Sequence, residues 1–270
     1  MVILGFLHFV APVGSPPLRL CVAAVLLLAV LAQPALAGLP ETITRIKPGI
    51  LGIGTVQLTR RPAGQFTGTG FVVGDGLHAI TNVHVLPAQI DRDHKEFLAV
   101  LTDAGAQEGV REATVVSTDP DHDVALLRFK GSPLPALKLG DSDRVREGEH
   151  FVFTGFPIGM ALGMRPVTHQ ALVSAVTPIV LPQISARTLD PKMVQRLGSP
   201  YNVFQLDATA YPGNSGSPLY HPETGQVVGI INKVFVKETK ENLLKEPSGI
   251  TYAIPAKFAA ALLRKAGVPE

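Results

Sequence analysis

Apolar residues in this chain fall in short runs rich in Val, Ile and Leu, and Gly, Pro and Asp separate one run from the next. From residue 49 onward the spacing of these runs is typical of β-strands joined by tight turns. Two sets of strands are expected: 52–58, 70–73, 78–81, 97–101, 113–117 and 124–129, then 151–155, 167–177, 203–206, 217–220, 226–236 and 250–254. Only residues 255–265 show the pattern of an amphipathic helix.

An interruption at 139–148, which contains Gly-Asp-Ser-Asp at 140–143, separates the two sets. Six strands on each side of it, with no helices between them, indicate an all-β sandwich or barrel pair rather than βαβ units. We expect the first half at about residues 49–142, the second at about 143–254 and the helix at about 255–265.

The composition is that of a folded protein. The chain is 46% hydrophobic and 17% charged, and its 26 Gly and 23 Pro make up 49 of 270 residues. These values are too apolar and too poor in charge for an intrinsically disordered chain. The net charge is +2, and no long run of Lys and Arg supplies the basic face that phosphate binding requires. We therefore expect no nucleic-acid partner.

The first 37 residues have the order of a secretory signal peptide. Arg19 precedes a 13-residue apolar run at 20–32, and the small residues Ala35 and Ala37 follow it. Cleavage after Ala37 would leave 270 − 37 = 233 residues. A second apolar stretch at 1–13 makes an uncleaved membrane anchor the alternative, although a spanning helix needs about 20 residues. Both interpretations place the domain outside the cytoplasm, in the periplasm or the extracellular space.

Two polar turns in the first half carry residues with catalytic potential. The run at 79–85 ends a strand of buried character in a polar turn that presents His84. Asp119, Asp121 and Asp123 then cluster at the entrance to the apolar strand that starts at Val124. Local sequence does not separate the three carboxylates.

The acidic cluster has the alternate spacing of a calcium loop but not its other residues. A loop that begins at Asp119 would need Gly at its sixth position and Glu at its twelfth, where this chain has Val124 and Lys130. We therefore expect no calcium site.

Zinc and disulfides are not expected either. His78, His84 and His122 have no Cys or helical His pair at the spacing of a zinc site. The only cysteine, Cys21, lies in the apolar run of the leader, so the folded domain has no second thiol with which to pair. We expect no metal and no other cofactor.

The most specific signal is Tyr-Pro-Gly-Asn-Ser-Gly-Ser-Pro at 211–218. A serine flanked by glycines on a tight turn exposes its hydroxyl, and the neighbouring N–H groups can point together towards one oxygen. Gly213 and Ser215 would supply the two donors of an oxyanion hole, each worth about 2.7–4 kcal/mol of transition-state stabilisation. The position of this turn after a candidate His and Asp favours a catalytic role for Ser215.

Six motifs, in order, resemble those of the trypsin-like serine protease domain, specifically its HtrA (high-temperature-requirement) branch. They are Gly-Thr-Gly-Phe at 68–71, Thr-Asn-Val-His-Val at 81–85, the acidic cluster and strand at 119–127, Gly-Phe-Pro-Ile-Gly at 155–159, Asp-Ala at 207–208 with Gly-Asn-Ser-Gly at 213–216, and Tyr-Ala-Ile-Pro at 252–255. The resemblance covers about residues 51–264. It implies two six-stranded antiparallel barrels of the trypsin-like type with a C-terminal helix, and an active site in the cleft between the barrels.

The resemblance also implies a catalytic triad. Ser215 would attack a peptide carbonyl, His84 would take the proton of Ser215 and pass it to the leaving amine, and Asp123 would fix the imidazole tautomer. Asp123 is favoured over Asp119 and Asp121 because it abuts the following strand as the family's aspartate does. The expected function is a serine endopeptidase that cleaves unfolded or exported polypeptides.

Three departures from the family pattern change the expectation. HtrA proteins usually carry peptide-binding PDZ domains after the protease domain, whereas this chain ends at Glu270, so regulation by a PDZ domain is not implied. Asn214 stands where digestive members have an Asp that pairs with a new N-terminus, and activation by that ion pair is not expected. Ser217 stands where the family commonly has a second Gly.

The pocket for the substrate side chain is expected to be uncharged. By resemblance its lining is Thr209, Ala210, Tyr211, Ile231, Asn232, Lys233 and Tyr252. Thr209 lies at the pocket base, where no Asp or Glu is present to pair with an Arg or Lys side chain. We expect cleavage after aliphatic residues, with broad specificity.

Some alternatives stay open from sequence alone. Residues 181–200 lack strand alternation and either gate the cleft or form a surface excursion. Two alternatives to an endopeptidase also stay open. One is a binding or holdase-like module in which the oxyanion turn is collapsed, and the other is an esterase that uses the same triad.

Overall fold

Twelve β-strands close into two antiparallel barrels of six strands, as the sequence predicts. The computed structural model describes residues 38–102, 109–158, 165–178, 201–232 and 249–270, which belong to one compact unit. Barrel one runs β1 (Ile50–Val56), β2 (Gly64–Val73), β3 (His78–Thr81), β6 (Val124–Phe129), β5 (Val110–Asp119) and β4 (Phe97–Leu101). Barrel two runs β10 (Pro218–Tyr220), β11 (Val227–Asn232), β12 (Ile250–Pro255), β9 (Asn202–Asp207), β8 (Val167–Pro178) and β7 (His150–Gly155).

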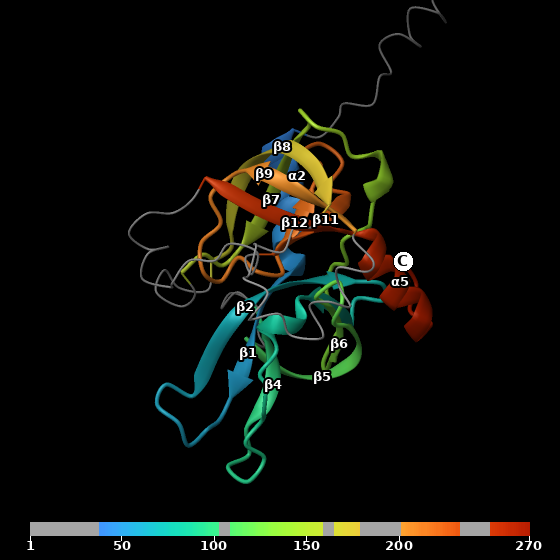
Figure 1. Cartoon of the computed structure of the whole chain (residues 1–270). Coiled ribbons are helices and arrows are strands. Elements are labelled where there is room, and N and C mark those ends of the chain that lie inside the picture. The colour runs from blue at the N-terminus through green and yellow to red at the C-terminus, as the bar shows by residue number, and fades with distance from the viewer. Residues whose placement is uncertain (1–37, 103–108, 159–164, 179–200, 233–248) are drawn as a thin grey trace, which may run out of the picture. The chain divides into compact units, whose positions relative to one another are not determined.

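Both barrels use the same strand order. Read from its first strand, barrel one runs 1-2-3-6-5-4 and barrel two runs 7-8-9-12-11-10. In each barrel the third strand therefore pairs with the last, as β3 with β6 and β9 with β12. Figure 1 shows the strands of barrel two above those of barrel one.

All of the expected strands are present. β3, β4 and β6 have the expected bounds, and the other strands differ from expectation by one to six residues at one or both ends. β11 is described to Asn232, and the remainder of the run expected to 236 lies outside the described residues. The expected leader at 1–37, the segment 181–200 and Lys233 also lie outside them.

Apolar side chains from both barrels form one cluster between them, which we call the shared core. Its members from barrel one, barrel two and the last helix include Phe71, Ile80 and Leu126, then Tyr220, Ile230 and Ile254, then Leu262 and Leu263. Each barrel also has its own interior cluster, which includes Leu98 and Val100 in barrel one and Phe153 and Leu219 in barrel two. Burial of apolar area in a cluster common to both halves couples their stability.

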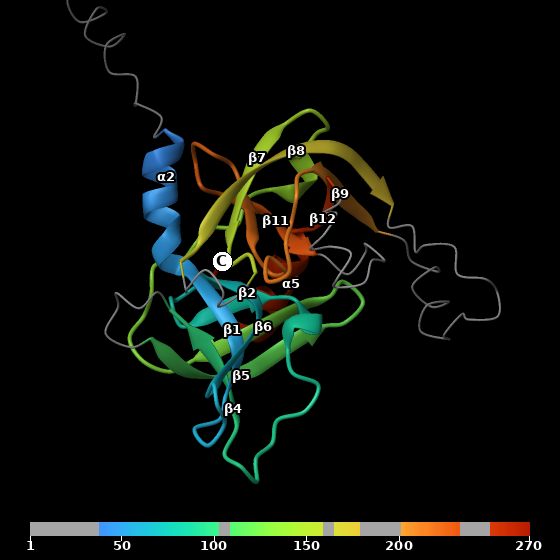
Figure 2. The same ribbon diagram turned by 90° about the vertical axis from the view of Figure 1, so that its left-hand side faces the viewer.

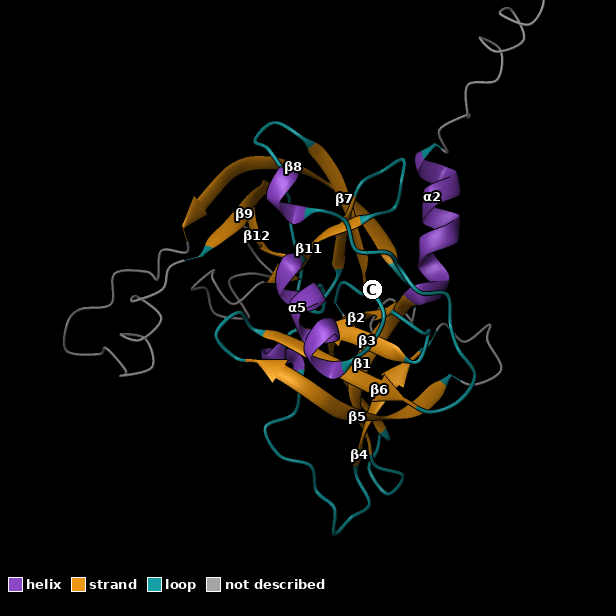
Figure 3. Cartoon of the chain, turned by 90° about the vertical axis from the view of Figure 1, so that its right-hand side faces the viewer, coloured by secondary structure: helices purple, strands orange, loops and turns teal. Residues whose placement is uncertain are grey.

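The expected C-terminal helix is α5 (Lys257–Ala266). It ends at Gly267, whose positive φ of 68° accommodates the left-handed cap that glycine adopts without strain. The linker between the barrels is attached to its first turn. Ser142 Oγ in η3 (Ser142–Arg144) accepts a hydrogen bond from Lys257 N (3.2 Å), and Lys257 Nζ pairs with Asp143 (2.7 Å). Figure 3 shows α5 at the level where the barrels meet.

The expectation of a single helix is wrong, because α2 (Leu39–Ile46) precedes the first strand. Tertiary contacts stabilise this short segment: Thr42 Oγ1 donates to Glu223 O (3.0 Å), Arg45 donates to Thr224 O (2.9 Å), and Ile46 enters the shared core. Figure 2 shows α2 alongside barrel two. No helix of the described residues is long and apolar enough to cross a membrane.

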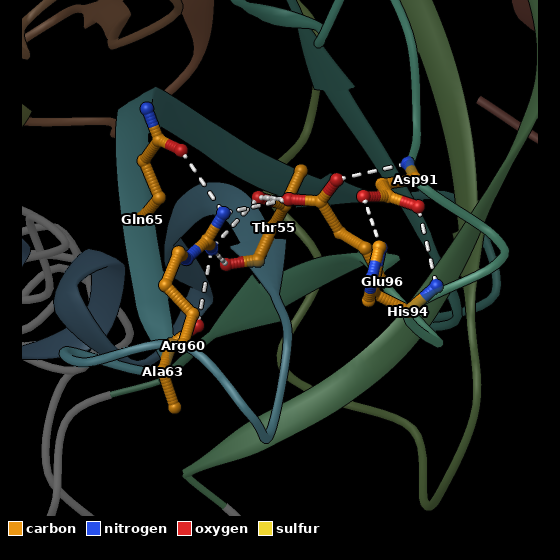
Figure 4. A network of polar contacts seen from close by, with 7 residues as sticks. All are labelled: Thr55, Arg60, Ala63, Gln65, Asp91, His94 and Glu96. Carbon is orange, nitrogen blue, oxygen red and sulfur yellow. Dashed lines mark hydrogen bonds and ion pairs between the residues drawn. The ribbon is translucent and has the colours of Figure 1, made fainter.

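A polar network fixes the outer end of barrel one (Figure 4). The Arg60 guanidinium, on the β1–β2 hairpin, pairs with Glu96 at 2.8 Å, and Glu96 also accepts from Thr55 Oγ1 at 2.6 Å. The second Glu96 carboxylate oxygen accepts from Asp91 N at 3.0 Å. These contacts join the hairpin to the loop that leads into β4.

Candidate active site

His84 lies in a short 3-10 turn, η2 (Val83–Val85), directly after β3. The turn is tied to the residue before β6, because Asn82 Nδ2 and Val83 N both donate to Asp123 O, at 2.9 and 3.3 Å. Since β3 and β6 are paired neighbours, these bonds place His84 and Asp123 at the same end of barrel one.

The side chains of His84 and Asp123 are in direct contact. His84 Nδ1 lies 2.6 Å from Asp123 Oδ2, and His84 N donates to Asp123 Oδ1 at 2.9 Å. An ionised carboxylate only accepts hydrogen bonds, so in a neutral His84 this contact favours the tautomer with the proton on Nδ1 and with Nε2 as the acceptor. A third donor, Asn232 Nδ2 from β11 of barrel two, reaches Asp123 Oδ2 at 2.7 Å.

The geometry distinguishes the three carboxylates of the acidic cluster. Asp123 holds His84, whereas Asp119 holds His122 through contacts at 2.7 and 3.1 Å. Asp123 has a positive φ of 54°, an uncommon backbone conformation that several contacts must hold in place. The hydrogen bonds accepted by the carbonyl and carboxylate oxygens of Asp123 are the contacts that hold it there.

Thr69 of β2 connects barrel one to the turn that carries Ser215. Thr69 N donates to Ser215 O at 2.8 Å, and Thr69 Oγ1 donates to Gly213 O at 2.7 Å. Thr69 Oγ1 also accepts from Phe156 N at 3.1 Å, and Thr69 O accepts from Thr81 Oγ1 at 2.7 Å. Thr69 thereby fixes the serine turn against both β3 and the end of β7.

Close backbone approach explains two of the glycines. A Cβ at Gly216, whose φ is 87°, would lie 1.9 Å from Thr69 O. A Cβ at Gly68 would lie 2.7 Å from the Val85 side chain and 3.0 Å from Ser215 O. The Ser215 backbone therefore approaches the turn that carries His84.

Two N–H groups of the serine turn, those of Gly213 and Ser215, make no hydrogen bond within the turn. Pro212 O accepts from Ile158 N (2.7 Å) and Asn214 O accepts from Ser217 N (3.0 Å), so the carbonyl oxygens of both peptide groups are occupied. The N–H of each planar trans peptide points away from its carbonyl oxygen. Among the described residues, neither Gly213 N nor Ser215 N donates a hydrogen bond.

The Ser215 hydroxyl has no hydrogen-bond partner within the described part of the chain, and the residue is 7% exposed. It is thus not bound to His84 Nε2 in this state. Catalytic hydrogen bonds are often long without substrate and tighten in the complex.

Behind the serine, Asn214 and Ser217 are fully buried. The Asn214 amide atoms and Ser217 Oγ have no partner among the described residues, and no charged group pairs with them there.

The expected pocket residues have different environments. Thr209 is partly buried, while Ala210 and Ile231 belong to the interior cluster of barrel two. Ala210 N donates to Thr251 Oγ1 at 3.1 Å, which fixes this segment to β12. Tyr211 and Tyr252 are partly exposed. Asn232, expected in the pocket wall, is fully buried and directs its amide to Asp123 instead.

His169 of β8 stacks on its cross-strand partner Phe153, with ring centroids 4.8 Å apart, and lies 6.3 Å from the ring of Tyr211. Burial lowers the pKa of His169, and its Nε2 is buried with no partner among the described residues. The His169 ring thus lies beside Tyr211, in the segment that leads to Ser215.

No cluster of three or more His, Cys, Asp or Glu side chains suited to a metal ion occurs in the described ranges. The polar groups nearest His84 contact one another, as His84 Nδ1 and Asn232 Nδ2 both lie within hydrogen-bond distance of Asp123 Oδ2.

Residues 68–230, 163 of the 270 residues, match the family described as trypsin-like peptidase domain. The chain belongs to this family. The match runs from the Gly-Thr-Gly motif of β2 into β11, and so includes His84, Asp123 and Ser215.

Curated relatives of this peptidase domain include a probable periplasmic serine endoprotease DegP-like of Pseudomonas putida (strain GB-1). It is 32% identical over an alignment of 238 residues that covers 84% of this chain and 41% of that protein. The mitochondrial serine protease HTRA2 of Drosophila pseudoobscura pseudoobscura is 29% identical over 206 residues, 76% of this chain and 40% of that protein. The chain spans less than half the length of these relatives.

Solved structures with the same fold include the HtrA-type protease AlgW. Its complex with a decapeptide matches with a TM-score of 0.61 and 23% identity over 85% of this chain and 67% of that one. Its complex with a tripeptide matches with a TM-score of 0.59 and 25% identity over 84% and 62%. These likenesses agree with the two-barrel trypsin-like fold.

Sequence analysis missed the contacts made by two site residues. The Gly-Thr-Gly motif marked the position of Thr69, but nothing local indicated that its partners are Gly213 and Phe156. Asn232 was expected in the pocket wall by resemblance, and its hydrogen bond to Asp123 was missed because the two residues are 109 positions apart.

Proposed function

We propose that this domain is a serine endopeptidase that uses Ser215 as nucleophile, His84 as general base and Asp123 as the orienting acid. The observation that carries the proposal is a fixed Asp123–His84 contact together with two N–H groups on the serine turn, Gly213 N and Ser215 N, that donate to none of the described residues. The family membership and the serine endoproteases among the relatives support it.

The proposed reaction begins when Ser215 Oγ attacks a peptide carbonyl carbon and its proton moves to His84 Nε2. The carbonyl oxygen becomes an oxyanion that accepts from Gly213 N–H and Ser215 N–H. His84 then gives the proton to the amine as the C–N bond breaks, which leaves an acyl-enzyme for water to hydrolyse. Asp123 stabilises the imidazolium formed in both steps.

The same turn geometry favours an enzyme over a holdase-like module. A collapsed oxyanion turn would direct a carbonyl oxygen into the hole or use its N–H groups internally. Here Pro212 O and Asn214 O are bound elsewhere, and Gly213 N and Ser215 N donate to none of the described residues. Ester hydrolysis shares this chemistry, so comparing casein with a short-chain ester separates the two activities.

The proposed substrates are unfolded or exported polypeptides, cleaved mainly after Val, Ala, Leu or Ile. Thr209, Ala210 and Tyr211 offer no carboxylate to a basic side chain, which would lose hydration without compensation. An aliphatic side chain gains about 25 cal/mol per Å² of buried apolar area. The peptide-bound complexes of AlgW support polypeptide binding.

The proposed location is outside the cytoplasm, with the leader at 1–37 as the export signal or, alternatively, a membrane anchor. The relative from Pseudomonas putida is named periplasmic, which supports export.

The deciding experiment is labelling with a serine-directed fluorophosphonate, together with casein hydrolysis. The wild-type protein should react and degrade casein, and Ser215→Ala should do neither while it melts like the wild type. Ser217→Ala, on the same turn, is the matched control and should still label. Casein hydrolysis by Ser215→Ala at the wild-type rate would refute the assignment.

Mass spectrometry of the casein fragments tests the substrate class separately. Most cuts should follow aliphatic residues. A majority of cuts after Arg or Lys would refute the pocket assignment but not the triad.

A further inference from the structure

Three aromatic rings meet beside the candidate catalytic acid. The His122 imidazole stacks on Phe258, with centroids 3.6 Å apart and an interplanar angle of 18°. Tyr201 packs edge-on against His122 at 4.5 Å and against Phe258 at 5.2 Å. Each ring contacts the other two, so the cluster is a closed triangle.

The rings come from different parts of the domain. His122 lies on the β5–β6 turn of barrel one, Tyr201 precedes β9 of barrel two, and Phe258 lies in the first turn of α5. The triangle therefore spans the seam between the barrels, one residue away from Asp123.

The turn itself makes His122 a rigid attachment point. Asp119 accepts from His122 N at 3.1 Å and contacts His122 Nδ1 at 2.7 Å, which fixes both the backbone and the ring. The next residue, Asp123, has a φ of 54° and depends on its surroundings to stay there. His122 and Asp123 are adjacent, so a shift of the His122 backbone would displace Asp123.

We propose that Phe258 and Tyr201 act as a clamp on His122 and are positioning residues for the His84–Asp123 pair. The inference rests on the proposed function. His84 and Asp123 belong to barrel one and Ser215 to barrel two, so productive geometry requires a fixed seam at this point. Thr69 and Asn232 join the barrels on the other sides of the site. The aromatic clamp is a third contact between the barrels, and it lies next to Asp123 in the sequence.

The test compares Phe258→Ala with Phe258→Tyr, using a fluorogenic peptide taken from a mapped casein cleavage site. Active sites are counted by fluorophosphonate titration. Misplacement of a catalytic group by about 1 Å can cost up to about 100-fold. Phe258→Ala should therefore lower kcat by about 10- to 100-fold with KM essentially unchanged, and Phe258→Tyr should restore it.

Two turn variants separate ring stacking from the Asp119 contact. His122→Phe keeps a ring against Phe258 and should retain most of the kcat. His122→Ala removes the ring and should match Phe258→Ala, which also covers the case in which the helix variant fails to fold. Equal loss in His122→Phe and His122→Ala would overturn the stacking argument.

Leu263→Ala is the matched control on α5, because Leu263 is buried in the shared core and is not part of the triangle. It should lower the melting temperature without lowering kcat per titrated site. Unchanged kcat in Phe258→Ala, or an equal loss in Leu263→Ala, would overturn the clamp.

A proton NMR readout distinguishes failure of the clamp from failure of the proposed function. The His84 Nδ1–H proton, held by Asp123, should give a low-field resonance in the wild type that weakens in Phe258→Ala and persists in Leu263→Ala. This signal needs no turnover. If the wild-type protein does not hydrolyse peptides, the proposed function fails, while the resonance still decides the clamp.

Discussion

At the scale of single residues, Thr69 links three parts of the site with one side chain and one peptide unit. Thr69→Val keeps the shape but leaves Gly213 O and Phe156 N without their partner. An unsatisfied buried polar group costs about 1–3 kcal/mol, and the serine turn loses its anchor. We expect lower stability in urea and a kcat at least about 10-fold lower. Thr69→Ser, which keeps the hydroxyl, is the control, and equal activity of both variants would contradict this role.

Asp123→Asn tests the choice among the three carboxylates. The amide N–H group that replaces the carboxylate can donate a hydrogen bond to an unprotonated His84 Nδ1 and so favour the tautomer with the proton on Nε2. The loss in kcat at neutral pH should be about 10⁴-fold. Asp121→Asn is the matched control, since Asp121 is exposed in the same turn. If Asp121→Asn were the more damaging change, the assignment of Asp123 would be wrong.

Residue types and order were enough to mark His84 and the serine turn, because a histidine after a strand and a serine between glycines are local features. The carboxylate required the family resemblance, since three aspartates share one turn. Thr69 and Asn232 have partners 144 and 109 residues away. Contacts across the barrel seam depend on how the barrels dock, which no local periodicity encodes.

At the scale of elements, strands were predictable where apolar runs are buried and bounded by turn residues. β3 and β6 are buried along almost their whole length and have the expected bounds. β2 begins at Gly64, six residues earlier than expected, because pairing with β1 rather than hydrophobicity extends it. α2 was missed because an eight-residue helix is stabilised by its contacts with barrel two and not by its own propensity.

His169, in barrel two, should make the stability of the domain sensitive to acid. Burial lowers the folded-state pKa of His169, so below the ordinary value of 6.5 the unfolded chain binds more protons than the folded one. The free energy of unfolding should therefore fall as the pH drops below about 6.5. His169→Phe should reduce the loss in melting temperature between about pH 7.5 and about pH 5. An identical pH dependence in the variant would contradict this account.

The Arg60–Glu96 pair should act in a different pH range. The Thr55 hydrogen bond is the main cause, with Arg60 contributing, of a lowered Glu96 pKa. The stabilisation is present above the ordinary carboxyl value and is lost as the pH falls through the lowered one. Glu96→Gln should lower the melting temperature at neutral pH, and the difference should shrink near about pH 3. Glu112→Gln removes an exposed pair with Lys130 and should have little effect.

At the scale of the whole domain, the site and the stability of the fold depend on different sets of contacts across the seam. Hydrogen bonds from Thr69 and Asn232 cross it at the active site. The shared core crosses it with apolar side chains of both barrels and of α5. A fold assembled this way should hold its catalytic geometry as long as the shared core keeps the barrels docked.

The shared core also predicts that the two barrels unfold together. Separation of the barrels would expose Phe71, Tyr220 and Ile254, each buried in that cluster, so neither barrel should persist alone. Calorimetry of the wild-type domain should show one transition with equal calorimetric and van't Hoff enthalpies.

Substitutions in the interior cluster of one barrel test this prediction. Leu98→Ala changes only the interior cluster of barrel one, and Phe153→Leu only that of barrel two. Leu98→Ala should lower the free energy of unfolding by about 2–5 kcal/mol. Each variant should lower the melting temperature of the same single transition, because the shared core couples the two barrels. Ile46→Ala, within the shared core, should also lower this melting temperature, while the kcat per titrated site stays unchanged. Two separate transitions, each moved only by the variant in its own barrel, would show that the barrels are independent and that the shared core does not couple them.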